Sequence, residues 1–101
     1  MKAPTEKQVQ QSIRRALLDL GFDVTSLSQP QRAMMTPGIP DLYARQQAWQ
    51  MRVWIEVKTL KGKVSLEQRC WHELERAAGG TVLVVRGALD AVEQIAKLRQ
   101  V

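Results

Sequence analysis

The feature that most constrains the fold is the run 51–59, in which apolar and polar side chains alternate. Its apolar positions are Met51, Val53, Ile55 and Val57, and the intervening positions are Arg52, Trp54, Glu56 and Lys58. Strict alternation is typical of a strand with one buried face, because successive side chains of a strand point to opposite faces of the sheet. The pattern therefore predicts a strand that buries its apolar side and carries Glu56 and Lys58 together on the other side.

Two capping boxes predict the starts of two helices. Thr5 with Gln8, and Ser65 with Gln68, have the spacing in which a side chain and a backbone donor satisfy each other in the first turn. The first helix is expected from about residue 5 to residue 20, and the second from residue 65 to about residue 78. The apolar stripe expected to face the core on the second helix consists of Leu66, Cys70, Leu74 and Ala77. His72 lies on the polar side of this helix and is expected at the surface.

Short strands are predicted at 22–27, 41–44 and 81–86, with residues 28–40 irregular and a last helix following Gly87. The run 81–86 is continuously apolar, as expected for a strand that is covered on both faces. The resulting order, α-β-β-β-α-β-α, predicts the α/β class, with a central mixed sheet of about four strands flanked by helices. At 101 residues the chain is expected to form one domain, residues 1–101.

Composition narrows the classes of function and the location. The formal net charge is +5, which favours binding to a polyanion, because neutralising phosphates releases condensed counterions. The chain has neither the roughly 18 consecutive apolar residues of a membrane span nor the apolar run of a signal peptide. The single cysteine, Cys70, permits no internal disulfide. We therefore expect a cytoplasmic protein with no membrane partner.

The residues that carry chemistry lie at the ends of two predicted strands. Asp41 follows Pro40, and Glu56 and Lys58 end the alternating strand. If the two strands form a hairpin, Asp41 lies near Glu56, and two such carboxylates require either a proton or a cation between them. Oxygen ligands of this kind suit Mg²⁺ or Mn²⁺, which can polarise a phosphate oxygen and generate a hydroxide nucleophile. Lys58 would orient the attacking water or stabilise charge on the phosphorus. Alternatively, Glu56 and Lys58 simply face solvent.

These residues resemble the motif of the PD-(D/E)xK nuclease superfamily, and more closely its VRR-NUC branch. The matching residues are Gly38-Ile39-Pro40-Asp41-Leu42, Trp54-Ile55-Glu56-Val57-Lys58, Leu66-Glu67-Gln68, Trp71 and Val82 to Arg86. The resemblance extends over nearly the whole chain, from Thr5 to about Ile95. It implies a restriction-endonuclease-like core and an endonuclease that hydrolyses DNA with Mg²⁺ or Mn²⁺. The stand-alone members of this branch are similar to Holliday-junction resolvases, which implies a homodimer that acts on branched DNA such as four-way junctions.

The resemblance also implies roles for individual residues. Asp41 and Glu56 correspond to the metal-binding carboxylates, with the Val57 carbonyl as a further ligand. Lys58 corresponds to the catalytic lysine. Gln68 corresponds to a glutamine near the active site. Glu6 stands where many superfamily members carry a further acidic residue.

Structural explanations compete with some of these roles. The capping box alone explains Gln68, and Glu6 is favoured at the start of a helix by the helix dipole. Packing in the core or in a dimer is favoured over stacking on unpaired bases for the three tryptophans, Trp49, Trp54 and Trp71. The basic residues near the site are phosphate contacts or ordinary surface charges: Arg32, Arg45, Arg52, Lys61 and Lys63. Gly38 is expected to allow close approach of the backbone to DNA.

Two other classes of function compete with the nuclease. One is a basic module of the same fold that binds DNA without cleaving it. The other is an oligomerisation domain that uses the tryptophan surfaces, which leaves the grouping of Asp41, Glu56 and Lys58 unexplained. Metal-dependent cleavage separates the nuclease from both alternatives, and binding of DNA without metal separates the two alternatives from each other.

Overall fold

The secondary structure of the computed structural model, which describes residues 2–27 and 36–100, has the order α-β-β-β-α-β-α. The elements are α1 (Glu6–Asp19), β1 (Asp23–Ser26), β2 (Leu42–Gln46), β3 (Met51–Val57), α2 (Leu66–Ala77), β4 (Val82–Val85) and α3 (Ala88–Arg99). This order confirms the prediction from the sequence. The segment 28–40, which is expected to be irregular, lies partly outside the described residues. Arg32, a proposed phosphate contact, lies outside them.

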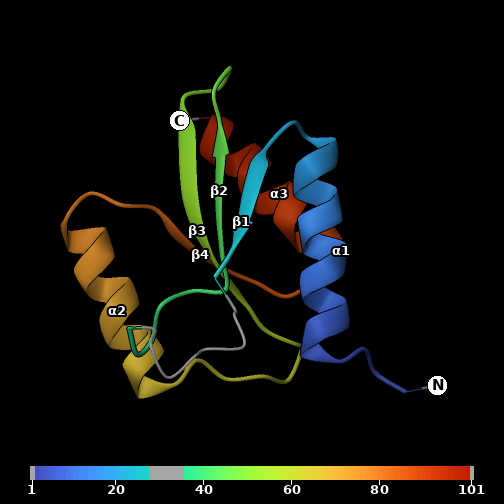
Figure 1. Cartoon of the computed structure of the whole chain (residues 1–101), viewed down its shortest axis with the longest axis vertical. Helices are drawn as coiled ribbons and strands as arrows, with labels where there is room; N and C mark the ends of the chain where they lie inside the picture. The colour runs from blue at the N-terminus through green and yellow to red at the C-terminus, as the bar shows by residue number, and fades with distance from the viewer. Residues whose placement is uncertain (1, 28–35, 101) are drawn as a thin grey trace.

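The four strands form one mixed sheet with the order β1-β2-β3-β4 (Figure 1). β1, β2 and β3 are antiparallel neighbours, and β4 pairs with β3 in parallel. The chain therefore crosses from β3 to β4 through α2, as a parallel connection requires. In the β2–β3 hairpin Leu42 pairs with Ile55 and Tyr43 with Trp54. This register places the start of β2 opposite the end of β3.

One face of the sheet carries the apolar core, which α1 and α3 cover together (Figure 1). Ile13 and Leu17 of α1 are fully buried, and Ile95 of α3 is nearly so. They pack against the apolar side chains of the strands, including Val53 and Ile55, which are also fully buried. The alternating pattern of β3 thus buries the side that the sequence predicts.

The helix α2 lies on the other side of the sheet (Figure 1). The face that it turns to the sheet is the opposite of the one predicted. Leu66 and Leu74, expected in the core, are 73% and 74% exposed, and Cys70 between them is exposed. His72, expected at the surface, is only 2% exposed. These predictions were wrong because α2 contacts the sheet through Gln68, Trp71 and His72 rather than through its leucines.

The edge strand β4 corrects the expectation that its apolar run is covered on both faces. Val82 and Val85 are buried, whereas Leu83 and Val84 between them are only half-buried. β4 has one neighbouring strand, β3, and α2 contacts it through few residues. None of the helices in the described part of the chain has the length and apolar character to cross a membrane.

Candidate active site

Asp41 is fixed by the backbone of the neighbouring strand. It immediately precedes β2, where its N–H donates to the Ile55 carbonyl at 3.1 Å. Its carboxylate Oδ2 accepts a hydrogen bond from the Val57 N–H at 2.8 Å, and the side chain is 6% exposed. These two bonds place Asp41 across from Glu56, as the predicted hairpin requires.

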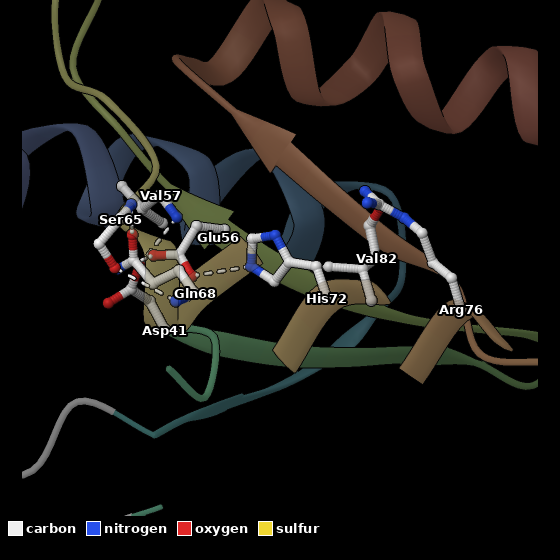
Figure 2. A network of polar contacts seen from close by, with 8 residues as sticks. All are labelled: Asp41, Glu56, Val57, Ser65, Gln68, His72, Arg76 and Val82. Atoms are coloured by element: carbon white, nitrogen blue, oxygen red, sulfur yellow. Dashed lines mark hydrogen bonds and ion pairs between the residues drawn. The ribbon is translucent and has the colours of Figure 1, made fainter. Parts of the chain in front are cut away.

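Glu56 is the most deeply buried charged residue of the site, with 1% exposure. Both of its carboxyl oxygens contact side chains of α2 (Figure 2). The Gln68 Nε2 donates to Oε2 at 3.1 Å, and the His72 Nε2 lies 3.2 Å from Oε1. Burial, together with a hydrogen bond to Asp41 and the charge of Asp41, raises the pKa of Glu56 from 4.5 to about 9. Without a cation, the carboxyl pair therefore holds a proton at neutral pH.

Lys58 follows the last residue of β3 and belongs to the same buried group. It is 8% exposed, and its N–H donates to the Val85 carbonyl at 3.0 Å, which continues the pairing with β4. Its positive charge lowers the pKa values of both Glu56 and His72, although burial outweighs it at Glu56. A solvated Glu56-Lys58 pair, the alternative left open by the sequence, is contradicted by the burial of both residues.

The loop after Lys58 is held in place by Arg86. The guanidinium Nη1 of Arg86 donates to the carbonyls of Thr59, Leu60 and Gly62 at 2.6, 3.3 and 2.7 Å. A single cation that bonds three carbonyls of one loop fixes the loop geometry, because charged donors make strong hydrogen bonds. Arg86 therefore anchors the segment that leaves the site and leads to α2.

Gln68 combines both interpretations that the sequence left open. Its Oε1 accepts from the Ser65 N–H at 2.9 Å, which completes the capping box of α2. Its Nε2 is then free to donate to Glu56, as described above. Capping holds the amide in one orientation, so the structural role of Gln68 supports its contact with the site.

Glu6 is connected to the site more weakly than the other predicted residues. It is exposed in the first turn of α1, whose Thr5–Gln8 capping box forms as predicted. Its charge contributes the smallest of the effects that raise the pKa of Glu56. The structure thus brings together Asp41, Glu56, Lys58 and Gln68, and leaves Glu6 at the periphery.

His72 is the site residue that sequence reasoning missed. Its pKa is lowered by burial and by the charges of Arg76 and Lys58. Since Glu56 and His72 are both uncharged at neutral pH, their contact is a hydrogen bond rather than an ion pair. One signal in the sequence pointed to His72: it lies four residues after Gln68, and residues with this spacing share one face of a helix.

Gly38, where the backbone was expected to approach DNA closely, instead packs against the first turn of α2. Its φ of +83° belongs to the left-handed region, and a Cβ there would collide with the carbonyl of Glu67 at the start of α2. The backbone before Asp41 therefore packs directly on the first turn of α2. This close packing fixes Asp41 and Gln68 relative to each other.

The tryptophans pack within the protein. Trp54 lies between Tyr43 and Trp71, with ring centroids 4.6 and 5.0 Å away, and its Nε1 donates to Glu75 at 3.1 Å. Trp49 contacts Phe22 and the guanidinium of Arg99, which lies 3.8 Å from the ring centroid. A cavity of about 830 Å³ near the β2–β3 hairpin is lined by Tyr43, Trp49 and Trp54, among others, but by none of the predicted catalytic residues.

The donor atoms at the site fit a hard divalent cation. Asp41 and Glu56 supply carboxylate oxygens, and Val57 presents its N–H to Asp41, so its carbonyl emerges on the same side of the strand. Among residues 2–27 and 36–100 no group of three or more acidic, histidine or cysteine side chains is arranged to hold a metal. Mg²⁺ commonly uses one or two carboxylates and keeps several waters. Without a cation, the raised pKa of Glu56 keeps this carboxyl protonated at neutral pH.

Comparisons with protein-family models, with curated proteins and with solved structures gave no match for the chain.

Proposed function

We propose that this protein is an endonuclease that hydrolyses DNA phosphodiester bonds with Mg²⁺ or Mn²⁺. The observation that carries the proposal is the burial of two adjacent carboxyls, Asp41 and Glu56, beside a buried lysine. Such an arrangement costs folding free energy, because a buried carboxyl must ionise with a partner or stay protonated. Proteins retain perturbed groups of this kind mainly at functional sites.

The proposal assigns a role to each residue of the site. Asp41, Glu56 and the Val57 carbonyl would hold the cation, and Gln68 fixes one oxygen of Glu56. A bound divalent cation would supply Lewis acidity to the scissile phosphate. Lys58 orients the attacking water and stabilises the negative charge that develops on the phosphorus. Glu6 contributes negative charge at the edge of the site.

The same face of the sheet offers positive charge for a DNA strand. Arg45 of β2 pairs directly with Arg52 of β3, and both are exposed. Like charges opposite each other destabilise a strand pair, so a bound polyanion would relieve their repulsion. Arg52 lies four residues before Glu56, on the same side of β3 and about 14 Å away along the strand. Lys61 and Lys63, exposed in the loop after the site, extend this charge.

The finer proposals rest on the resemblance to VRR-NUC nucleases. They are a restriction-endonuclease-like core, a preference for branched DNA and a homodimer. The mixed sheet with a parallel β3–β4 crossover is compatible with such a core. A dimer would allow a domain of this size to address two strands of a junction at once.

Cleavage of a labelled four-way junction and a matched linear duplex, in Mg²⁺, Mn²⁺ or EDTA, tests the proposal. Asp41→Asn retains an acceptor for the Val57 N–H but removes the charge, and should lower the rate about a hundredfold or more. The matched control is Asp23→Asn, an exposed acid of β1, which should cut like the wild type.

Three outcomes would decide between the classes. Metal-dependent cutting that Asp41→Asn loses supports the nuclease, and faster cutting of the junction than of the duplex supports selectivity for branched DNA. Equal cutting by Asp41→Asn and the wild type would overturn the assignment of the site. Tight binding of both DNAs without cutting would identify a non-catalytic binding module.

A further inference from the structure

The buried imidazole of His72 has no packing explanation. Burying a polar ring costs free energy unless it is hydrogen-bonded, and an apolar residue would fill the same volume without that cost. The side chain of His72 is 3% exposed and contacts a carboxyl that is itself 1% exposed. The position thus places a polar group against Glu56 where packing alone would favour leucine.

The orientation of α2 strengthens this point. The helix has an apolar stripe, yet Leu66 and Leu74 point to solvent and its polar side faces the sheet. Arg76 donates to the Val82 carbonyl at 2.7 Å, one turn beyond His72 (Figure 2). Beside the ring contact of Trp71 with Trp54, α2 therefore contacts the sheet through hydrogen bonds, and two of these converge on Glu56.

The two contacts leave room for a cation on Glu56. A carboxylate has about four lone-pair positions, and Gln68 and His72 each occupy one, on different oxygens. Two hydrogen-bond partners on different oxygens fix the rotation of the carboxyl group about its last bond. The carboxyl in this orientation also meets the carboxyl of Asp41 through a side-chain hydrogen bond.

We propose that His72 is a positioning residue of the metal site, which holds Glu56 in the orientation that binds the divalent cation. This inference rests on the proposed function, since it assigns the partner of the same site. An ionised Glu56 only accepts hydrogen bonds, so the imidazole would donate its Nε2–H to it. Hydrogen-bond partners of metal ligands typically change metal affinity 10- to 100-fold when they are removed.

Binding of Mn²⁺, followed by its electron paramagnetic resonance signal, tests the proposal without DNA. His72→Gln and His72→Asn form a matched pair, because both carry an amide and differ by one methylene. Gln68 already shows that a glutamine amide on this helix reaches Glu56, at 3.1 Å. We expect His72→Gln to bind Mn²⁺ within about threefold of the wild type and His72→Asn to bind about tenfold more weakly.

His72→Leu provides a second removal of the donor, with the volume filled, in case the asparagine variant does not fold. Circular dichroism establishes folding for each variant. Leu74→Gln, an exposed change on the same helix, should leave Mn²⁺ affinity unchanged. In cleavage assays the Mn²⁺ concentration for half-maximal activity should rise by the same factor in His72→Asn, with the rate at saturating Mn²⁺ nearly restored.

The outcomes distinguish this inference from the proposed function. Folded His72→Asn or His72→Leu with the Mn²⁺ affinity of the wild type would overturn the role of His72 and leave the metal site intact. If His72→Gln bound Mn²⁺ as weakly as His72→Asn does, the role of His72 would also be overturned. Affinity would then not depend on whether the side chain at position 72 is long enough to contact Glu56. A wild type that binds Mn²⁺ no better than Asp41→Asn would overturn the metal site itself, and this inference with it.

Discussion

The two sides of the sheet are built on different principles. On one side α1 and α3 bury apolar side chains such as Ile13 and Leu17 against the strands. On the other side α2 turns its leucines to solvent. It contacts the sheet through the ring of Trp71 and through hydrogen bonds of Gln68, His72 and Arg76. Both sides use amphipathic helices, but only the first uses the apolar stripe for packing.

The two sides of the sheet contribute differently to the stability of the fold and to the positioning of the site. Full burial of a leucine or isoleucine contributes about 1.5–3 kcal/mol, whereas a hydrogen bond contributes about 0.5–1.5 kcal/mol net. The α1–α3 side therefore supplies most of the free energy of folding. The hydrogen bonds of α2 fix the orientation of the groups that they contact, because a hydrogen bond depends on angle as well as distance. A site that must hold Glu56 in one orientation gains more from the second kind of contact.

The largest expected effect on stability belongs to the apolar side. Leu17→Ala removes a fully buried side chain from the core and should lower the free energy of unfolding by about 2–5 kcal/mol. Urea denaturation followed by circular dichroism measures this change. A loss below about 1 kcal/mol would mean that the core does not dominate, and the contrast between the two sides would fail.

The apolar side was also the part that the sequence predicted well. Helical spacing of Val9, Ile13 and Leu17, and alternation along β3, depend on one physical rule, the burial of apolar area. The capping boxes were equally readable, because their partners lie three residues apart in the chain. Local geometry and a single driving force were enough to predict the element order and the mixed sheet.

The effect of intermediate size is the dependence of stability on pH that the carboxyl group of Glu56 produces. In EDTA, the free energy of unfolding should fall as the pH rises from about 7 to 9, by up to about 1.4 kcal/mol per pH unit. The reason is that folded Glu56, with a pKa of about 9, keeps a proton that the unfolded chain releases near 4.5. The stabilising contribution is complete below the unfolded pKa and is lost as the pH passes through the folded one.

Glu56→Gln is the control for this prediction, and its stability should vary little over the same range. His72 does not interfere there, because its lowered pKa affects stability only below about 6.5, and in the opposite direction. Thermal melts at several pH values give the comparison. If the wild type were as stable at pH 9 as at pH 7, folding would not raise the pKa of Glu56, and the prediction would be wrong.

The candidate site was predictable only in part. Asp41, Glu56 and Lys58 could be grouped because a hairpin register follows from two adjacent strands. His72 could not be placed by the same reasoning, since hydrophobic periodicity assigns the polar side of a helix to solvent. That rule fails where a buried carboxyl on another element needs hydrogen-bond partners, and such a need appears only after the strands and the helix are assembled.

The smallest expected effect concerns the exposed leucines of α2. It is the sharpest test of whether the polar side of this helix faces the sheet. Leu74→Gln should change the free energy of unfolding by no more than about 0.5 kcal/mol, because the side chain is 74% exposed. If α2 instead packed through its leucines, as its periodicity suggests, the same change would cost several times as much. Urea denaturation beside Leu17→Ala places both leucines on one scale. A large loss at Leu74 would mean that α2 lies the other way round, which would also withdraw His72 and Gln68 from Glu56.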